Sequence, residues 1–292
     1  MIYLLLSIVS SSIIFLVFKL FDKYQVNTFQ AIVVNYLIAS VSGILSYEQP
    51  INFTAIPSYS WLPGTLFLGV LFIVIFNLMA ITTQRSGLSV VSVATKMSVV
   101  LPITFGLIHY NESSGTLKII GILLALIAVY LVSLKKSIDK TAATKSSLVF
   151  PILVFLGSGI IDTTIKFLED SYVSEQDVPL FSAMIFVTAL ILGISVLGYQ
   201  LLKGKEKLHY KNLLGGIALG IPNYYSIYFL VQALRHPSLE SSTVFTLNNV
   251  GIVMAATLIG ILFFKEKLST KNWIGIAIAV ISIILIAAVK SN

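Results

Sequence analysis

Lys96 is an ionisable residue inside a long apolar run. It lies nine residues after Gly87, where the run begins, or roughly 13 Å along a helix. A Lys near the centre of a bilayer costs about 2.5 to 3.5 kcal/mol to insert. Two interpretations stay open: a snorkelling or ion-paired side chain that joins helices, or a cation in a solvated cavity that attracts an anionic or carboxylate-bearing ligand. Pro102 removes one hydrogen bond from the same helix, so we expect a bend there.

Asp162 and Lys166 lie four residues apart in another apolar run, so they share one face of a helix and can form an ion pair. A carboxylate at the depth of Asp162 is also suited to bind and release a proton as a cavity opens and closes, which couples transport to a gradient. Both interpretations stay open, and Asp162 and Lys166 are the candidate proton-coupling residues.

Amides and tyrosines are the third group of polar side chains in apolar runs. Tyr224, Tyr228 and Gln232 recur every four residues and share a helix face, close to Pro222. An aromatic belt or ordinary packing explains the tyrosines, whereas amides in hydrocarbon need partners and suit a binding wall. Each Asn is equally able to hydrogen-bond a neighbouring helix or a ligand. The candidate substrate-binding residues are Asn35, Asn77, Lys96, Asn223, Tyr224, Tyr228, Gln232, Asn248 and Asn249.

The elements that carry these residues are predicted to cross a membrane. Of the 292 residues, 57% are hydrophobic and 11% charged, and the mean hydropathy is +0.96, which excludes an ordinary soluble domain. A spanning helix needs about 20 apolar residues. Ten runs are long enough, and they cover approximately 1–20, 28–47, 61–84, 87–110, 115–134, 148–168, 179–202, 212–234, 239–263 and 270–289.

Composition also excludes several classes of function. The ten runs leave too little chain for a separate soluble domain, and no HExxH, P-loop, GxSxG or dinucleotide-binding motif is present, so we expect no enzyme. The absence of cysteine excludes disulfides and thiolate chemistry. We expect no cofactor and no metal site. We also expect no nucleic-acid partner, because the positive charges behind the net charge of +7 lie mostly in short loops, as the positive-inside rule predicts. The N-terminal run lacks a basic start and a cleavage site, which favours a retained first helix.

Two halves of the chain match each other. Lys135–Ser147 is a basic linker that separates residues 1–134 from residues 148–292. Lys19 and Lys166 lie at the same spacing after similar apolar triplets, and Glu112 and Glu266 each lie nine residues before a Gly that begins the last helix of a half. We expect both glutamates to cap helices or bond loops. The matches predict two five-helix repeats.

Charge placement predicts that the repeats are inverted. The loops after the odd-numbered helices carry 14 of the 19 basic residues, and those after the even-numbered helices carry 3. By the positive-inside rule the odd loops are cytoplasmic and both termini lie outside the cytoplasm. Because five is odd, a tandem copy inserts upside down, which is typical of secondary transporters.

With "NESSGTLKIIG" and "KEKLSTKNWIG" closing its halves, the sequence resembles the drug/metabolite transporter superfamily and its EamA-like ten-helix members. The resemblance spans nearly the whole chain. It implies a basket of helices around a central cavity, formed mainly by the third, fourth, eighth and ninth helices with contributions from the first and sixth. It also implies transport of small organic solutes or metabolites, often by export. Many relatives place their termini in the cytoplasm, opposite to the charge pattern here.

We therefore expect an all-α integral membrane protein of ten transmembrane helices, built as two inverted repeats around a central cavity. Its function is predicted to be alternating-access transport of a small metabolite across the cytoplasmic membrane, with membrane lipids and protons as further partners. The alternatives are a flippase for lipids or lipid headgroups, a membrane-embedded enzyme acting on lipid-linked substrates, and a membrane scaffold.

Overall fold

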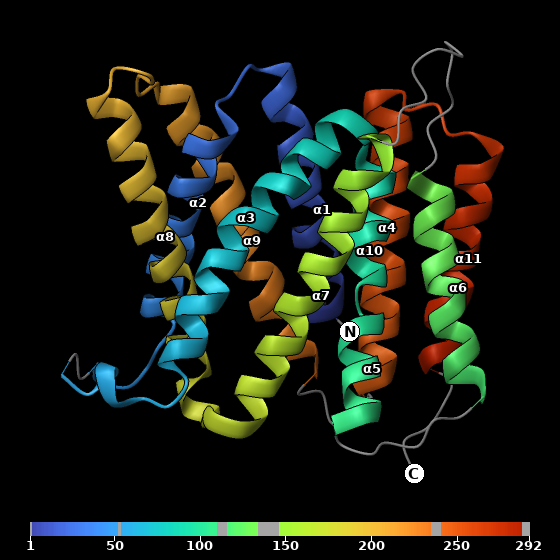
Figure 1. Cartoon of the computed structure of the whole chain (residues 1–292), viewed down its shortest axis with the longest axis horizontal. Helices are drawn as coiled ribbons and strands as arrows, with labels where there is room; N and C mark the ends of the chain where they lie inside the picture. The colour runs from blue at the N-terminus through green and yellow to red at the C-terminus, as the bar shows by residue number, and fades with distance from the viewer. Residues whose placement is uncertain (1, 52–53, 110–115, 134–145, 235–240, 288–292) are drawn as a thin grey trace.

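The computed structural model describes residues 2–51, 54–109, 116–133, 146–234 and 241–287, and every regular element in these ranges is a helix (Figure 1). The helices of the first half are α1 (Ile2–Lys23), α2 (Thr28–Leu45), η1 (Ile56–Ser58), α3 (Leu62–Ser86), α4 (Leu88–Met97), α5 (Val100–His109) and α6 (Thr116–Ser133). Those of the second half are α7 (Ser146–Tyr172), η2 (Glu175–Asp177), α8 (Val178–Leu202), α9 (Tyr210–Leu234), α10 (Ser241–Phe264) and α11 (Thr270–Ala287).

Eight helical segments among the described residues are long and apolar enough to cross a membrane. One of them combines α4 with the start of α5, over Leu88–Phe105. The remaining helices, α6 and α11, contain the shorter apolar stretches Ile119–Val132 and Thr270–Leu285 and pack against each other. The chain is a multi-pass membrane protein by this measure.

The fourth predicted helix is broken, and the break confirms the expected effect of Pro102. Because Pro102 has no backbone N–H, it cannot donate to the carbonyl of Ser98. Leu101 N donates to Ser98 O instead, at 2.9 Å, in a tighter turn. The Ser98 hydroxyl donates to Thr95 O at 2.5 Å, a local bond that also competes with the helical ladder. The helix therefore ends at Met97 and resumes at Val100.

Helices from the two halves interleave in the bundle. In Figure 1 the α6–α11 pair stands at one side, and α2, α8 and α9 stand at the other. Contacts between the halves include α2 with α9, α3 with α8, α1 with α10, α4 with α7 and α4 with α10. The candidate residues on α4 and α7 are therefore brought to adjacent helices from segments far apart in sequence.

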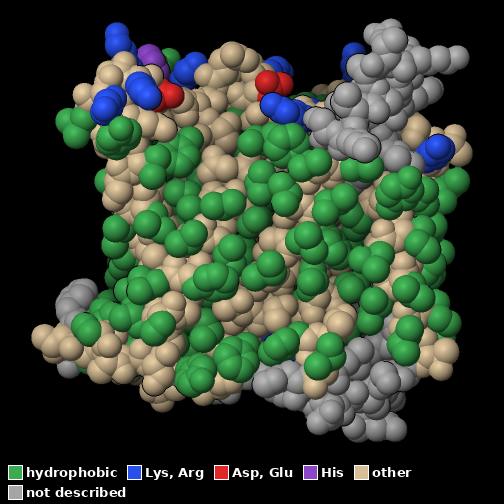
Figure 2. Space-filling model, viewed as in Figure 1, with side chains coloured by type: hydrophobic (Ala, Val, Ile, Leu, Met, Phe, Trp, Pro, Cys, Tyr) green, Lys and Arg blue, Asp and Glu red, His purple; other side chains and the backbone are tan. Residues whose placement is uncertain are grey.

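The loops that follow α1, α3, α8 and α10 share one face of the molecule, at the top of Figure 1. Lys and Arg side chains gather along this edge, above a band dominated by hydrophobic side chains (Figure 2). We call it the basic face. α2 and α7 end at the opposite face, where α11 also ends (Figure 1).

Close backbone approach joins α2 to α9. A Cβ added at Gly216 would lie 2.7 Å from the backbone oxygen of Ala31, and one at Gly220 would lie 2.9 Å from that of Asn35. Small residues that let helices approach so closely are typical of membrane interfaces. At the basic face, Gln30 of α2 forms two further polar bonds. Its Oε1 accepts from Asn212 Nδ2 of α9 at 2.6 Å, and its Nε2 donates to Glu206 Oε2, in the loop before α9, at 3.2 Å.

Candidate functional site

Lys96 lies in the last turn of α4, two residues before the break at Ser98. Its side chain is half-buried, whereas Ser98 is fully enclosed. The position follows from the sequence, because Pro102 ends α4 at this depth. Lys96 is thus held where the backbone of the fourth span leaves its regular hydrogen-bonding pattern.

Asp162 on α7 faces this break. Its Oδ2 lies 3.4 Å from the hydroxyl of Ser98, and its carboxylate interacts electrostatically with the ammonium of Lys96. Asp162 itself is exposed, so its carboxylate is open to the space beside α4 and α7. An opposite charge nearby lowers the cost of keeping Lys96 away from bulk water. The structure brings together two charges that the sequence placed on separate helices.

The intrahelical pair of Asp162 with Lys166 is not among the contacts that the structure describes for Asp162. Its described polar partners are Lys96, in the last turn of α4, and Ser98, directly after α4. Lys166 is exposed one turn further along α7. Asp162 is therefore connected to the break in the fourth span.

Asn35 and Asn223 bond to each other. Asn223 Nδ2 on α9 donates to Asn35 Oδ1 on α2 at 3.1 Å, and both side chains are buried. Asn35 Nδ2 has no partner among the described atoms. The structure thus shows the interhelical hydrogen bond that the sequence left open as an alternative to ligand binding for these two residues.

The other amides differ in their surroundings. Asn77 is half-buried on α3, and its Nδ2 donates to Ile73 O of the same helix at 2.7 Å. Asn248 and Asn249 are buried on α10, and Asn248 Oδ1 has no partner in the described part of the chain. A buried oxygen without a donor is costly, so it is the amide most in need of a ligand or water. Gln232 is half-buried near the end of α9.

Aromatic rings form a cluster on α9. Tyr224 and Tyr228 stack with ring centroids 6.2 Å apart, as their spacing predicts. Tyr225 contacts both rings edge-on and stacks on Phe229 at 5.4 Å. Phe229 in turn stacks on Tyr3 of α1. Tyr225 and Tyr228 are 40% and 37% exposed, so the cluster presents ring surface to its surroundings.

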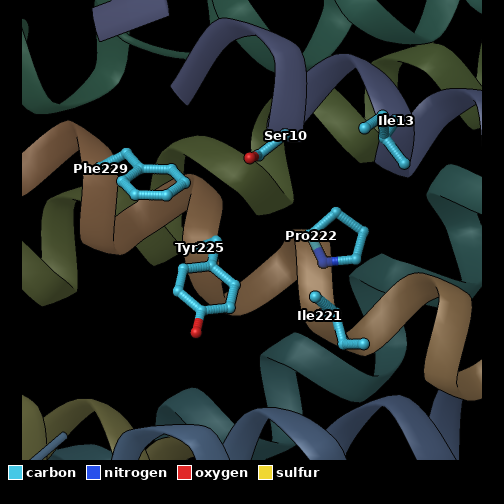
Figure 3. Close-up of a pocket in the computed structure, with 6 residues that line it drawn as sticks. All are labelled: Ser10, Ile13, Ile221, Pro222, Tyr225 and Phe229. Atoms are coloured by element: carbon cyan, nitrogen blue, oxygen red, sulfur yellow. The ribbon is translucent and has the colours of Figure 1, made fainter. Parts of the chain in front are cut away.

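A cavity of about 250 Å³ lies between α1 and α9 beside this cluster (Figure 3). Its lining is mostly apolar and consists of Ser10, Ile13, Ile221, Pro222, Tyr225 and Phe229. The Ser10 hydroxyl points into it in Figure 3, and Ser10 is 8% exposed. Pro222 cannot donate to the carbonyl of Ala218, four residues earlier, which leaves an acceptor on α9.

Sequence reasoning did not select Ser10, Tyr225 and Phe229 as candidates. The run of serines from Ser10 to Ser12 in an apolar helix was a usable signal, because hydroxyls in hydrocarbon need partners. Tyr225 and Phe229 lie beside the Tyr224 stripe but off its face, so periodicity alone did not connect them to it.

Outside the membrane-spanning segments, Tyr47 follows α2 and donates to Asp177 Oδ1 at 3.0 Å. Desolvation and this carboxylate raise the pKa of Tyr47, so it remains a neutral donor. Among the described residues no cluster of three His, Asp or Glu could hold a metal ion. Glu112, Arg235, His236 and the linker residues 135–145 lie outside the described residues, and so do the side chains of His109 and Lys118.

The comparisons with known proteins agree with this membrane architecture. The sequence pattern of the EamA-like transporter family matches residues 1–134 and 145–288. A protein of Haemophilus influenzae described as uncharacterised is 27% identical over 277 residues, which cover 94% of this chain and 93% of that protein. The glucose uptake protein GlcU of Bacillus subtilis is 30% identical over 211 residues, covering 70% of this chain and 69% of GlcU. Because the family match spans nearly all of its length, the chain belongs to the EamA-like transporter family, within the drug/metabolite transporter superfamily.

Proposed function

We propose that the protein is a secondary transporter that moves a small polar organic solute across the cytoplasmic membrane by alternating access. The observation that carries the proposal is the group of Lys96, Ser98 and Asp162 at a broken helix. Discontinuous helices with charged groups near mid-membrane are typical of substrate and ion sites in transporters. Family membership supports a transporter rather than an enzyme.

We propose further that ten spans form two inverted five-helix repeats. The family pattern matches the chain as two segments of similar length. The contacts come in corresponding pairs: α2 with α9 and α8 with α3, or α1 with α10 and α7 with α4. Such exchanged pairs are expected when two copies of one unit are related by a pseudo-two-fold axis, and the rocking of one copy against the other gives alternating access.

The substrate class that we propose is a neutral, polyhydroxylated solute such as a monosaccharide. Asp162 balances the charge of Lys96, so the pair presents donors and acceptors without a large net charge. The amides and the exposed tyrosine rings suit hydroxyl groups and an apolar ring face, respectively. One relative is named as a glucose uptake protein. An anionic solute, attracted by Lys96, is the competing outcome.

A thermal-stability screen of the purified protein tests the substrate class. The library contains monosaccharides, amino acids, nucleosides, organic acids and lipid headgroups. A ligand present at 100 times its dissociation constant adds about 2.7 kcal/mol of stability. We expect sugars to raise the transition temperature of the wild type and to lose this effect in Lys96→Ala. A shift by organic acids alone would replace the neutral class with the anionic one.

The direction of transport is tested in vesicles of opposite orientation. Export is what the superfamily resemblance implies, whereas uptake is named for the Bacillus relative. Accumulation of labelled solute in inside-out vesicles, but not in right-side-out vesicles, is the result that export predicts.

A lipid or lipid-headgroup flippase is the second candidate, favoured by the mostly apolar cavity between α1 and α9. If every soluble compound fails in the screen and lipids shift the transition, the flippase replaces the solute transporter.

A further inference from the structure

Glu266 lies in the loop between α10 and α11, and its carboxylate caps a helix of the other half. Leu88 N, at the first residue of α4, donates to Glu266 Oε1 at 2.9 Å. A carboxylate at a helix N-terminus satisfies a free N–H and interacts favourably with the helix dipole. The helix it caps carries Lys96 at its other end. The expectation that Glu266 caps a helix is confirmed.

Two glycines, Gly87 and Gly260, lie so close to the Glu266 carboxylate that a larger residue at either position would contact it. A Cβ at Gly87 would lie 2.7 Å from Glu266 Oε1, and a Cβ at Gly260 would lie 2.6 Å from Oε2. Gly87 also has a φ of 102°, which side chains rarely adopt. The Glu266 N–H donates to Gly260 O at 3.0 Å, so the residue is fixed to the end of α10. Two glycines, one from each half, thus enclose the carboxylate.

Lys19 on α1 completes the contact. Its Nζ lies 3.7 Å from Glu266 Oε1 and donates to Thr83 O, in the last turn of α3, at 3.4 Å. The side chains of Lys19 and Glu266 are 20% and 12% exposed. A cation at the C-terminal end of α3 and an anion at the N-terminal end of α4 each match the local helix dipole. One ion pair therefore links α1, α3, α4 and α10 at the basic face.

We propose that Glu266 is a positioning residue for transport, and that the contact of Lys19, Glu266 and the α4 N-terminus, here the Glu266 junction, keeps the basic face closed. Opening on this side must separate α4 from the end of α10 and so break the junction. Charged groups next to water regain hydration when they part, so an ionic junction releases at smaller net cost than a buried apolar seam. This inference rests on the proposed alternating access.

Cysteine labelling tests the junction, because the chain has no cysteine of its own. Ser92 on α4 is fully buried four residues beyond the capped Leu88. Ser92→Cys is reacted with a membrane-impermeant maleimide applied to the basic face. We expect Lys19→Met and Glu266→Gln to raise the labelling rate roughly fivefold, the effect of losing a partly exposed ion pair. Lys267→Met, which removes an exposed charge from the same loop, is the matched control.

The double variant and a binding measurement separate positioning from a structural role. Lys19→Met combined with Glu266→Gln should label no faster than either single variant, because both remove the same ion pair. Both single variants should keep the thermal shift that is induced by the monosaccharide with the largest effect on the wild type, while their rate of solute transport changes. If Lys19→Met and Glu266→Gln label only as fast as Lys267→Met, the proposal that the Glu266 junction keeps the basic face closed is wrong. Ser89→Cys, also fully buried on α4, repeats the measurement if Ser92→Cys fails to fold. If the monosaccharide with the largest thermal shift changes the labelling of wild-type-background Ser92→Cys from neither face, the alternating-access proposal fails instead.

Discussion

Lys96 and Asp162 balance each other across two helices. Ser98 lies beside both, with its hydroxyl 3.4 Å from the carboxylate and its backbone at the break in the fourth span. Removing one of two interacting opposite charges leaves the other charge uncompensated, which is costlier than removing both. The two residues should therefore be studied singly and together.

Replacing Lys96 by alanine should abolish transport while the protein still inserts in the membrane. The substitution removes the cation and leaves Asp162 without its partner. Solute flux in proteoliposomes measures the effect, and Lys271→Ala, at an exposed position in the first turn of α11, serves as the control. Wild-type flux in Lys96→Ala would remove this residue from the mechanism.

Replacing Asp162 by asparagine should make transport independent of pH. Asparagine keeps the size and an acceptor for Ser98 but cannot take up a proton, so a flux driven through this carboxylate loses its pH dependence. Flux is measured over a series of pH values for wild type, Asp162→Asn and the exposed control Asp22→Asn. A wild-type pH profile in Asp162→Asn rules out proton coupling through this residue.

At the scale of elements, two features stand out. The close contact between α2 and α9, here the α2–α9 seam, joins the two halves, and the fourth span is broken between α4 and α5. The seam depends on Gly216 and Gly220, which bring backbones together beside the Asn35–Asn223 hydrogen bond. The break depends on Pro102 and divides the span into α4 and α5. We expect the seam to stay rigid while the two parts of the broken span change their relative orientation.

Gly220→Ala should destabilise the protein by about 1 to 3 kcal/mol, because overpacking forces a close backbone contact apart. The added Cβ would lie 2.9 Å from Asn35 O and 2.7 Å from Ile38 Cβ. Gly198→Ala is the matched control, since its Cβ would meet nothing within 4 Å. Thermal unfolding in detergent compares the two. Equal transition temperatures would show that the seam tolerates an extra methyl group.

At the scale of the whole molecule, the basic face distinguishes the two sides of the bundle. The loops after α1, α3, α8 and α10 lie together on it, and their Lys and Arg side chains form one edge (Figure 2). Clustered cations beside a membrane favour the cytoplasmic side. This placement agrees with the loop charges, while the sidedness itself is a prediction.

Single-cysteine labelling in intact cells should show Lys205→Cys protected from an impermeant reagent, because the basic face is predicted to be cytoplasmic. Lys205 is exposed in the loop between α8 and α9. Ser174→Cys, exposed between α7 and α8 at the opposite face, should react. A reporter fused after Asn292 should likewise lie outside the cytoplasm. The reverse pattern would invert the predicted topology.

Much of the helical layout follows from the sequence. The runs predicted at 28–47, 61–84 and 179–202 correspond to Thr28–Leu45, Leu62–Ser86 and Val178–Leu202. The boundary predicted between the runs 61–84 and 87–110 separates α3 from α4, and Pro102 predicted the disturbance of the fourth span. Hydropathy, turn residues and proline act over a few neighbouring residues, so they can be recognised without knowing the fold.

Side-chain partners were decided by the tertiary structure alone. Spacing places Lys166 on the same helix face as Asp162, whereas only the fold brings Ser98 and Lys96 of the fourth span to this carboxylate. Asn35 bonds to Asn223, 188 residues away, and Glu266 caps a helix 178 residues before it. Such pairs depend on which helices pack together, and that packing is set by the shapes of whole helix surfaces. The sequence by itself therefore determined a bundle of membrane helices whose basic loops lie on one side. Only the tertiary structure decided which charged and amide side chains contact each other.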